Sequence, residues 1–207
     1  MYFNKTQKES IEKKIKEVEQ KSSAELVAVI TKKSDGYEYV GLLISLLFTV
    51  ILTGYLLVVF SGLREEYILL TQVTVIVSLS LLFTYKSKLL MCLLPKSYKY
   101  NISSKYANTN FATLGLNNTQ TKQAIMFFVS VEEKYVEIIT DSNIKEKIPD
   151  SKWQDIVDVF IEDVKKENIY LGYSKAIDSC SSILIENFPV KQNDVNELED
   201  EIIELKI

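Results

Sequence analysis

The chain has 207 residues and a formal net charge of −4, from 24 lysines and arginines and 28 acidic residues. It contains no histidine, which excludes histidine-activated nucleophiles, histidine-ligated metals and histidine proton shuttles. Arg64 is the only arginine, so arginine clusters that bind phosphates or nucleic acid are also excluded. The two cysteines, Cys92 and Cys180, are too few for a disulfide framework.

The first segment predicts a helix followed by a strand. Thr6 to Glu9 has the pattern of a capping box, and apolar residues then recur at Ile11, Ile15 and Val18. This spacing predicts one amphipathic helix that ends near Lys21. Residues 24–31 form a short apolar run of strand length, which is typical of a strand buried on both faces.

Two uncharged stretches follow, at residues 39–63 and 67–85. As helices they would measure roughly 37 and 28 Å at 1.5 Å per residue, close to the thickness of a bilayer core. Only residues 64–66 separate them, so we expect a transmembrane hairpin. The alternative is a pair of buried helices in a soluble core, but a domain of this size is too small to enclose both.

The distribution of basic residues predicts the orientation of this hairpin. Lysines flank its outer ends, whereas the connecting loop has only Arg64. Both termini should therefore be cytoplasmic, in a two-span protein of the cell (inner) membrane, with the lipid bilayer as one partner. The flanking lysines are Lys32, Lys33, Lys86, Lys88, Lys96 and Lys99.

The part after the hairpin predicts further α/β elements. Residues 98–114 favour a helix, and residues 124–131 and 134–140 favour two strands joined by a tight turn at Glu132 and Glu133. Apolar periodicity predicts a helix starting near Pro149 and a last helix over residues 173–187. The acid-rich residues 191–207 are interpreted as a solvated tail.

The order of these elements predicts one α/β domain interrupted by the hairpin, since residues 1–38 are too few to fold alone. The fold class is a three-layer α/β/α domain with a small mixed sheet. We expect its two parts at residues 1–38 and 86–190, with the hairpin at 39–85 and the tail at 191–207. The first strand should lie parallel to the second, and the third antiparallel to the second.

This topology brings two carboxylates together. Glu25 begins the first strand and Asp141 ends the third, and these two strands are expected to be antiparallel. Both side chains should therefore lie at the same edge of the sheet, opposite the turn at Glu132 and Glu133.

At this point the sequence resembles the TPM-domain family, which is related to thylakoid acid-phosphatase-like and photosystem-repair proteins. The resemblance rests on residues 11–30, with Ser-Ala-Glu before a strand, and on residues 124–131 and 133–144. Further matching pieces are residues 98–121, 152–156, 173–177 and 187–189. It implies a three-layer α/β/α domain and, for some relatives, divalent-ion binding and acid-phosphatase activity. The chain departs from the family pattern at two positions. The family usually has glycine where this chain has Asn143, and glycine is common where this chain has Ala124.

The candidate site consists of Glu25, Asp141 and Asn143. Their oxygen atoms suit Ca²⁺ or Mg²⁺ rather than zinc. Such an ion could hold a phosphate and polarise a water without histidine or arginine. The competing interpretation is that Asp141 caps its turn and Glu25 pairs with a lysine. Trp153 and Cys180 are interpreted as core residues, and Asp150 and Asp155 as acids near a helix N-terminus.

Two functions follow from these observations. One is a membrane-anchored module that recruits or stabilises membrane proteins in assembly or repair, with a membrane-protein partner and no nucleic acid. The other is a divalent-metal-dependent phosphatase at the cytoplasmic membrane face, so whether the protein is an enzyme stays open.

Overall fold

The computed structural model describes residues 2–60, 62, 64–166, 168–190 and 201–205. The chain divides into two compact units, Met1–Ser34 with Tyr100–Ile207, and Asp35–Lys99. The first unit is an α/β domain that the second unit interrupts in sequence.

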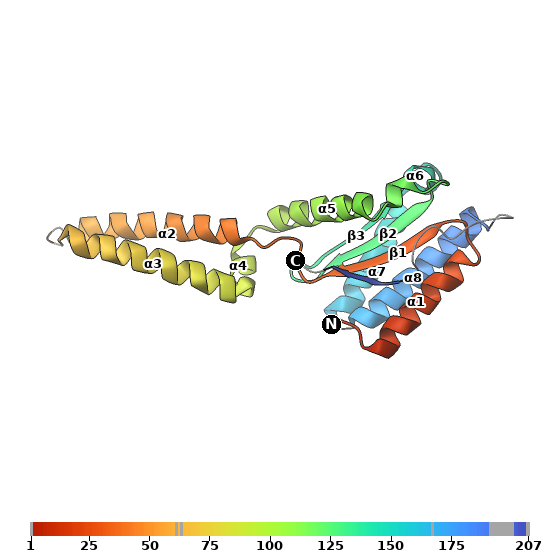
Figure 1. Ribbon diagram of the computed structural model, residues 1–207, viewed down its shortest axis with the longest axis horizontal. Coiled ribbons are helices and arrows are strands. Elements are labelled where there is room, and N and C mark those ends of the chain that lie inside the picture. Colours follow the sequence, from red (N-terminus) through yellow and green to blue (C-terminus); the bar gives the residue numbers. More distant parts are fainter. Residues whose placement is uncertain (1, 61, 63, 167, 191–200, 206–207) are drawn as a thin grey trace. The chain divides into compact units, whose positions relative to one another are not determined.

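The α/β unit contains a four-stranded sheet in the order β3-β2-β1-β4 (Figure 1). Strand β1 (Glu25–Thr31) lies parallel to β2 (Ala124–Ser130), and β2 lies antiparallel to β3 (Tyr135–Thr140). The prediction that the first strand pairs with strands beyond the apolar hairpin is therefore confirmed. Both central strands are buried along their whole length, as expected for strands covered on two faces.

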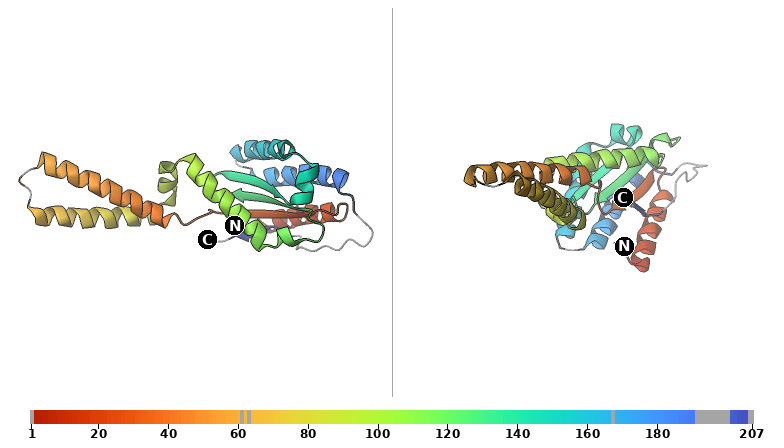
Figure 2. Two further views of the ribbon diagram at one scale, coloured as in Figure 1. Left: turned by 90° about the horizontal axis from the view of Figure 1, so that it is seen from above. Right: turned by 60° about the vertical axis from the view of Figure 1, so that its left-hand side comes forward.

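Helices cover both faces of this sheet, which confirms the three-layer α/β/α architecture (Figure 2). One face packs against α1 (Lys5–Glu19), α7 (Asp150–Lys165) and α8 (Ile169–Asn187). The other packs against α5 (Lys96–Thr113) and the short helix η1 (Leu116–Asn118). The side chains of each strand alternate between these two cores.

The larger core centres on three aromatic rings that meet edge to face. The ring centroid of Phe127 lies 5.0 Å from that of Phe160 and 5.1 Å from that of Tyr173, and the last two are 5.4 Å apart. The Tyr173 hydroxyl donates a hydrogen bond of 2.9 Å to the carbonyl of Val29. Burial raises the pKa of Tyr173 well above its ordinary value, so this hydroxyl stays a donor.

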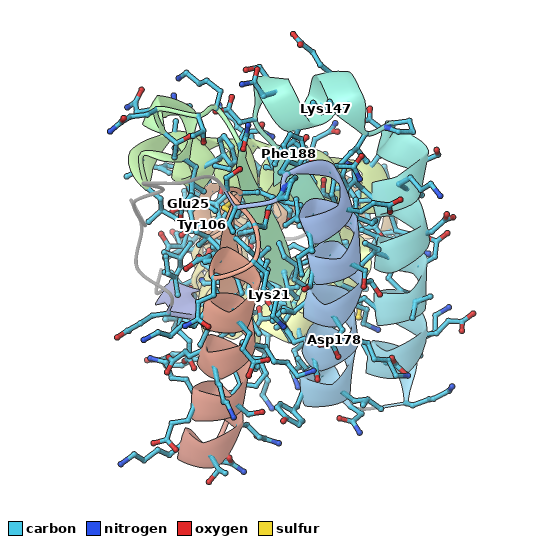
Figure 3. All side chains as sticks on the ribbon, turned by 90° about the vertical axis from the view of Figure 1, so that its right-hand side faces the viewer. Lys21, Glu25, Tyr106, Lys147, Asp178 and Phe188 are labelled. Atoms are coloured by element: carbon cyan, nitrogen blue, oxygen red, sulfur yellow. The ribbon has the colours of Figure 1, made fainter. Side chains whose placement is uncertain are left out.

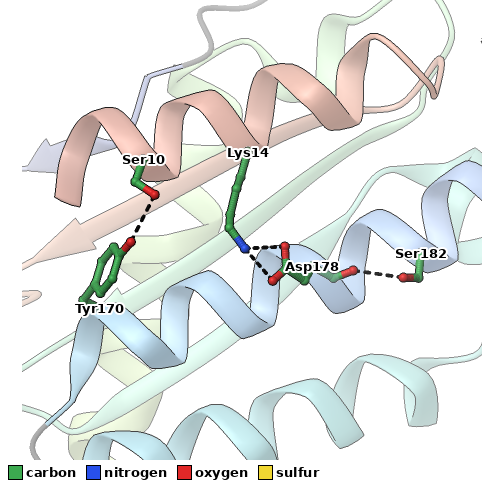
Figure 4. Close-up of polar contacts among 5 residues, drawn as sticks. All are labelled: Ser10, Lys14, Tyr170, Asp178 and Ser182. Atoms are coloured by element: carbon green, nitrogen blue, oxygen red, sulfur yellow. Dashed lines mark hydrogen bonds and ion pairs between the residues drawn. The ribbon is translucent and has the colours of Figure 1, made fainter. Parts of the chain in front are cut away.

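Polar contacts hold α1 against α8 at the surface of the helical layer (Figure 4). Lys14 donates to both carboxylate oxygens of Asp178, with 2.6 Å from Nζ to Oδ1. Tyr170 donates to the hydroxyl of Ser10 over 3.0 Å. Both polar contacts lie at the periphery of a core that is stabilised by the burial of apolar side chains.

Two sequence-based expectations for the α/β unit were wrong in detail. The capping box at the start of α1 is formed by Asn4 and Gln7, whose side chains each accept from the other's backbone N–H, and Thr6 lies inside the helix. The C-terminal region is not a solvated tail throughout. Ile203–Leu205 form strand β4, which pairs parallel to β1, and Ile202 is buried; residues 191–200 lie outside the described residues.

The second unit is a helical hairpin of α2 (Glu38–Val59) and α3 (Glu65–Tyr85), followed by α4 (Ser87–Leu93). Both long helices are apolar enough to cross a membrane, and only 11% and 6% of their most apolar windows are buried within the protein. The first helix ends at Val59 rather than Leu63, and the second begins at Glu65 rather than Tyr67. Sequence analysis did not predict α4.

Small and hydroxyl-bearing side chains form the contact between α2 and α3. Gly41, Ser45 and Thr49 are the buried residues of α2 and recur every four positions, so they lie along one face of the helix. A Cβ atom at Gly41 would lie 3.3 Å from the Cβ of Phe83, so glycine permits this close approach. Gln72 also donates to the Thr53 hydroxyl over 3.0 Å, which links the two helices by a hydrogen bond. This packing is typical of helices that associate in lipid.

Candidate functional site

The sheet end that begins at Glu25 brings the candidate residues together. Glu25 lies opposite Ala124 in the β1–β2 register, and the backbone N–H of Asp141 donates to the carbonyl of Ala124 over 2.8 Å. The three residues therefore form a row across β1, β2 and the end of β3. The prediction that Glu25 and Asp141 share one edge of the sheet is confirmed.

Glu25 and Ala124 also share a face of the sheet. Val27, Val29, Met126 and Phe128 belong to the core beneath α5, and Glu25 and Ala124 continue that alternation. Two strand spacings of about 4.8 Å separate the backbones of β1 and β3. Ala124, between the two acidic positions, contributes only a methyl group and is fully buried. Figure 3 looks onto the side of the domain where Glu25 is labelled.

Asp141 has two differently placed oxygens. It is the N-cap residue of α6 (Ser142–Lys147), and its Oδ1 accepts a 2.7 Å hydrogen bond from the N–H of Ser142. Its Oδ2 is buried and has no hydrogen-bond partner among the described residues. The expected capping role is thus present, and it uses one oxygen while the second is left for another donor or a cation.

Asn143 lies in the first turn of α6 and is held by the loop before β2. Its backbone N–H donates to the carbonyl of Lys122 over 3.2 Å, and its side-chain Nδ2 donates to the carbonyl of Thr121 over 2.6 Å. Asn143 is one of the two positions at which the family pattern has glycine. In this chain Asn143 is helical, and the residue with positive φ is Lys122, at 54°.

Further polar groups lie beside Glu25, which is only 7% exposed. Its N–H donates to the carbonyl of Gln123 over 3.1 Å, and the Ser23 hydroxyl donates to the side-chain Oε1 of Gln123 over 2.9 Å. The candidate ligands at this sheet end are therefore carboxylate, hydroxyl and amide groups. The described residues contain no group of three histidine, cysteine, aspartate or glutamate side chains placed to hold a metal. A cation here would bind Glu25 and Asp141 and take its other ligands from carbonyl, amide or water oxygens.

A second feature, which sequence analysis missed, is an open groove of about 590 Å³ along β3. Residues of β3 form its floor, α5 contributes Tyr100 and Asn108, and α7 contributes Trp153 and Val157. We call this the β3 groove. The sequence predicts this strand beside the second strand, but it does not show where α5 and α7 lie, and these helices form the walls of the groove.

Glu137 and Tyr135 give the β3 groove its polar side. The Tyr135 hydroxyl donates to Glu137 Oε2 over 2.9 Å, and the ring of Tyr100 lies 5.2 Å from that of Tyr135. Ser104 on α5 donates to Glu137 Oε1 over 3.3 Å. Partial burial raises the pKa of Glu137 above its ordinary value, and burial raises the pKa of Tyr135 to about 12.

The remaining candidates have structural roles. Trp153 is 4% exposed and packs in the main core, and Cys180 is buried in the same core. Burial raises the pKa of the Cys180 thiol to about 12, which makes it unreactive. Asp150 is the first residue of α7, where the helix dipole favours a negative charge, and Asp155 lies exposed on the same helix.

Comparisons with known proteins place this fold. A family model described as "TPM domain" matches residues 83–183. An NMR structure of the BA42 protein from the psychrophilic bacterium Bizionia argentinensis is similar, with a TM-score of 0.62 over 99% of this chain and 97% of that chain. The two sequences are 16% identical, so the similarity concerns the fold. No curated protein matches the chain.

Proposed function

We propose that this chain, whose residues 83–183 match the TPM-domain family model, is a membrane-anchored interaction module that recruits or stabilises membrane proteins in assembly or repair. The observation that carries this proposal is the β3 groove, an open surface beside an end strand of the sheet. Sheet ends with accessible backbone groups are common sites for protein recognition. A module of this kind requires a surface and an anchor, but no catalytic centre.

The apolar hairpin supplies the anchor in this proposal. Most of the surface of α2 and α3 is apolar and exposed, which is costly in water and favourable in lipid. We propose that both helices cross the cell (inner) membrane and that both termini are cytoplasmic, because the flanking lysines lie on that side of the hairpin.

Cysteine labelling on intact cells tests this topology. In a Cys92→Ser background, Glu65→Cys at the start of α3 should react with an impermeant thiol reagent, whereas Lys152→Cys, which is exposed on α7, should react only after lysis. The reverse pattern would place the α/β domain outside the cell.

Co-purification in mild detergent tests the module itself. The tagged chain should retain specific membrane proteins that an unrelated tagged two-span protein does not retain. If only lipid and detergent accompany the chain after cross-linking in cells, the module proposal fails.

The buried oxygen of Asp141 favours a second candidate, a divalent-metal-dependent phosphatase at the cytoplasmic membrane face. Glu25 and Asp141 would hold Ca²⁺ or Mg²⁺, with Asn143 contributing its amide oxygen. A bound cation of this kind supplies charge to a phosphate oxygen and lowers the pKa of a bound water. In the chain itself, Asp141 caps α6 with one oxygen, and its second oxygen is buried and accepts no hydrogen bond from the described residues.

Calorimetry with CaCl₂ or MgCl₂ tests this candidate separately from activity. Asp141→Asn keeps an oxygen to cap α6 and removes the charge, so it should lower the affinity for the cation at least about tenfold with little change in melting temperature. Asp150→Asn, an exposed acid at another helix start, is the matched control and should bind as the unaltered chain does. Equal binding by all three proteins would remove the metal site.

A further inference from the structure

Strand β3 presents unused backbone groups to the β3 groove. Its neighbour β2 lies on one side only, and no other described strand lies beyond it. The hydrogen bond from Asp141 to Ala124 fixes the alternation of the antiparallel ladder. By that alternation, Val136, Ile138 and Thr140 direct their N–H and C=O groups away from β2. An extended segment could therefore continue the sheet.

The two walls of the β3 groove differ in chemistry. On the α7 side, Trp153, Val157 and Ile161 provide apolar side chains beside Val136 and Ile138 of the strand. Polar and charged residues also line the groove, namely Asp150 and Gln154 of α7 together with Lys134 and Lys145. On the α5 side the wall is polar. It is formed by Tyr100, Asn108, Tyr135 and Glu137. Because successive side chains of a strand point to opposite faces, a segment that fits must alternate between apolar and polar residues.

The negative charge of Glu137 determines which residue type suits the polar position of that segment. Glu137 is the acidic residue in the middle of β3, and the groups that contact its carboxylate are the hydroxyls of Tyr135 and Ser104. A basic side chain on an added strand would lie beside this carboxylate, and opposite charges at such positions stabilise strand pairing. A second copy of β3 offers only Tyr135, Glu137 and Ile139 on this face, so it supplies no cation.

We propose that the β3 groove binds an extended segment of a partner protein that has an apolar–basic–apolar pattern and adds to the sheet beside β3. The inference rests on the proposed function as an interaction module and names the surface and chemistry of the recognition. The lysine or arginine of the segment pairs with Glu137, and its flanking apolar residues contact the α7 wall.

The test uses the full-length chain in detergent micelles and a fluorescein-labelled peptide, Val-Thr-Val-Lys-Val-Thr-Val. Its threonines and lysine would face α5 and its valines α7. The matched probe has glutamate in place of lysine and should bind about tenfold more weakly by fluorescence anisotropy. A third probe, N-methylated on alternate residues to remove the donors that face β3, should not bind.

Variants of Glu137 connect the effect to this residue. Glu137→Gln should weaken binding of the lysine peptide about threefold to fivefold, and Glu137→Lys should reverse the preference toward the glutamate peptide. Glu17→Gln, an exposed acid on α1, is the control and should change neither affinity. The reversed preference cannot arise from unfolding, which would weaken both probes.

Three results would overturn the inference. They are equal binding of the lysine and glutamate peptides, an unchanged preference in Glu137→Lys, and no binding of either peptide up to about 1 mM. In each case, continued co-purification of membrane proteins would leave the module proposal standing with a different surface. Loss of co-purification together with intact peptide binding would contradict the proposed function as an interaction module, but not the peptide site in the β3 groove.

Discussion

Replacing Glu133 by alanine is expected to destabilise the α/β domain by about 3 kcal/mol, because it removes the acceptor at the centre of a buried polar network. Glu133 is 2% exposed and lies in the turn between β2 and β3. Its Oε1 accepts from the N–H of Ser34 over 2.9 Å, and its Oε2 accepts from the hydroxyl of Ser130 over 2.5 Å. The Ser34 hydroxyl in turn donates to Ser130 Oγ over 2.9 Å.

This network fixes the chain where it leaves β1. Ser34 is the last residue of the first segment of the α/β unit, and the chain continues from it into the apolar hairpin. Without the carboxylate, the N–H of Ser34 and the hydroxyl of Ser130 would be buried with no acceptor. Each such group costs about 1–3 kcal/mol, and bonds to a charged partner lie at the upper end of that range.

Thermal unfolding in detergent measures the effect. Glu133→Ala should lower the melting temperature by about 6–12 °C, taking 2–4 °C per kcal/mol for a domain of this size. Glu133→Gln keeps one oxygen for Ser34 and should lose less than half as much. Glu17→Ala on α1 is the control, since the carboxylate of Glu17 is exposed and lies 3.9 Å from Lys13 at the surface. A melting temperature for Glu133→Ala equal to that of the control would show that the network does not stabilise the domain.

Glu133 also illustrates what the sequence could not reveal. As one of two adjacent acids between strands, it predicts a turn, and the turn is there. Its burial depends on Ser34 and Ser130, which are about 100 residues apart in sequence and meet only because β1 pairs with β2. The local sequence pattern therefore predicts the turn, whereas the contacts of Glu133 with Ser34 and Ser130 form only in the assembled sheet.

The same distinction explains the successes and errors at the sheet ends. Residues 24–31 and 124–131 are continuous apolar runs, and a run of this kind predicts a strand covered on both faces. Glu25 begins β1 and Asp141 directly follows β3, so topology alone places them at the same end of the sheet. Strand β4 has only three residues, and it follows a run of acidic residues and contains Glu204, so the acidic character of this segment hides its short apolar alternation. The β3 groove requires the strand order and the positions of α5 and α7, which no local pattern contains.

The main core gives the largest expected effect of a single substitution. Phe127→Ala should cost about 3–5 kcal/mol, because the ring is 1% exposed and its removal leaves a cavity that the two neighbouring rings cannot fill. Phe160 and Tyr173 belong to α7 and α8, so this ring joins the central strand to both helices. A domain of marginal stability would lose most of its folding free energy.

A comparison of three variants separates the loss of folding free energy caused by the cavity from losses with other causes. Phe127→Leu should cost roughly 1–2 kcal/mol, because leucine refills part of the volume. Tyr173→Phe keeps the aromatic cluster and removes only the hydrogen bond to Val29, at about 1 kcal/mol.

Proteolysis of the full-length chain in detergent should follow the same order, with Phe127→Ala cleaved most rapidly in the α/β unit. Because Phe127 lies on the strand that pairs with β1 across the sequence interruption, cleavage should extend to residues on both sides of the hairpin. Cleavage confined to the segment after the hairpin would contradict a single cooperative core.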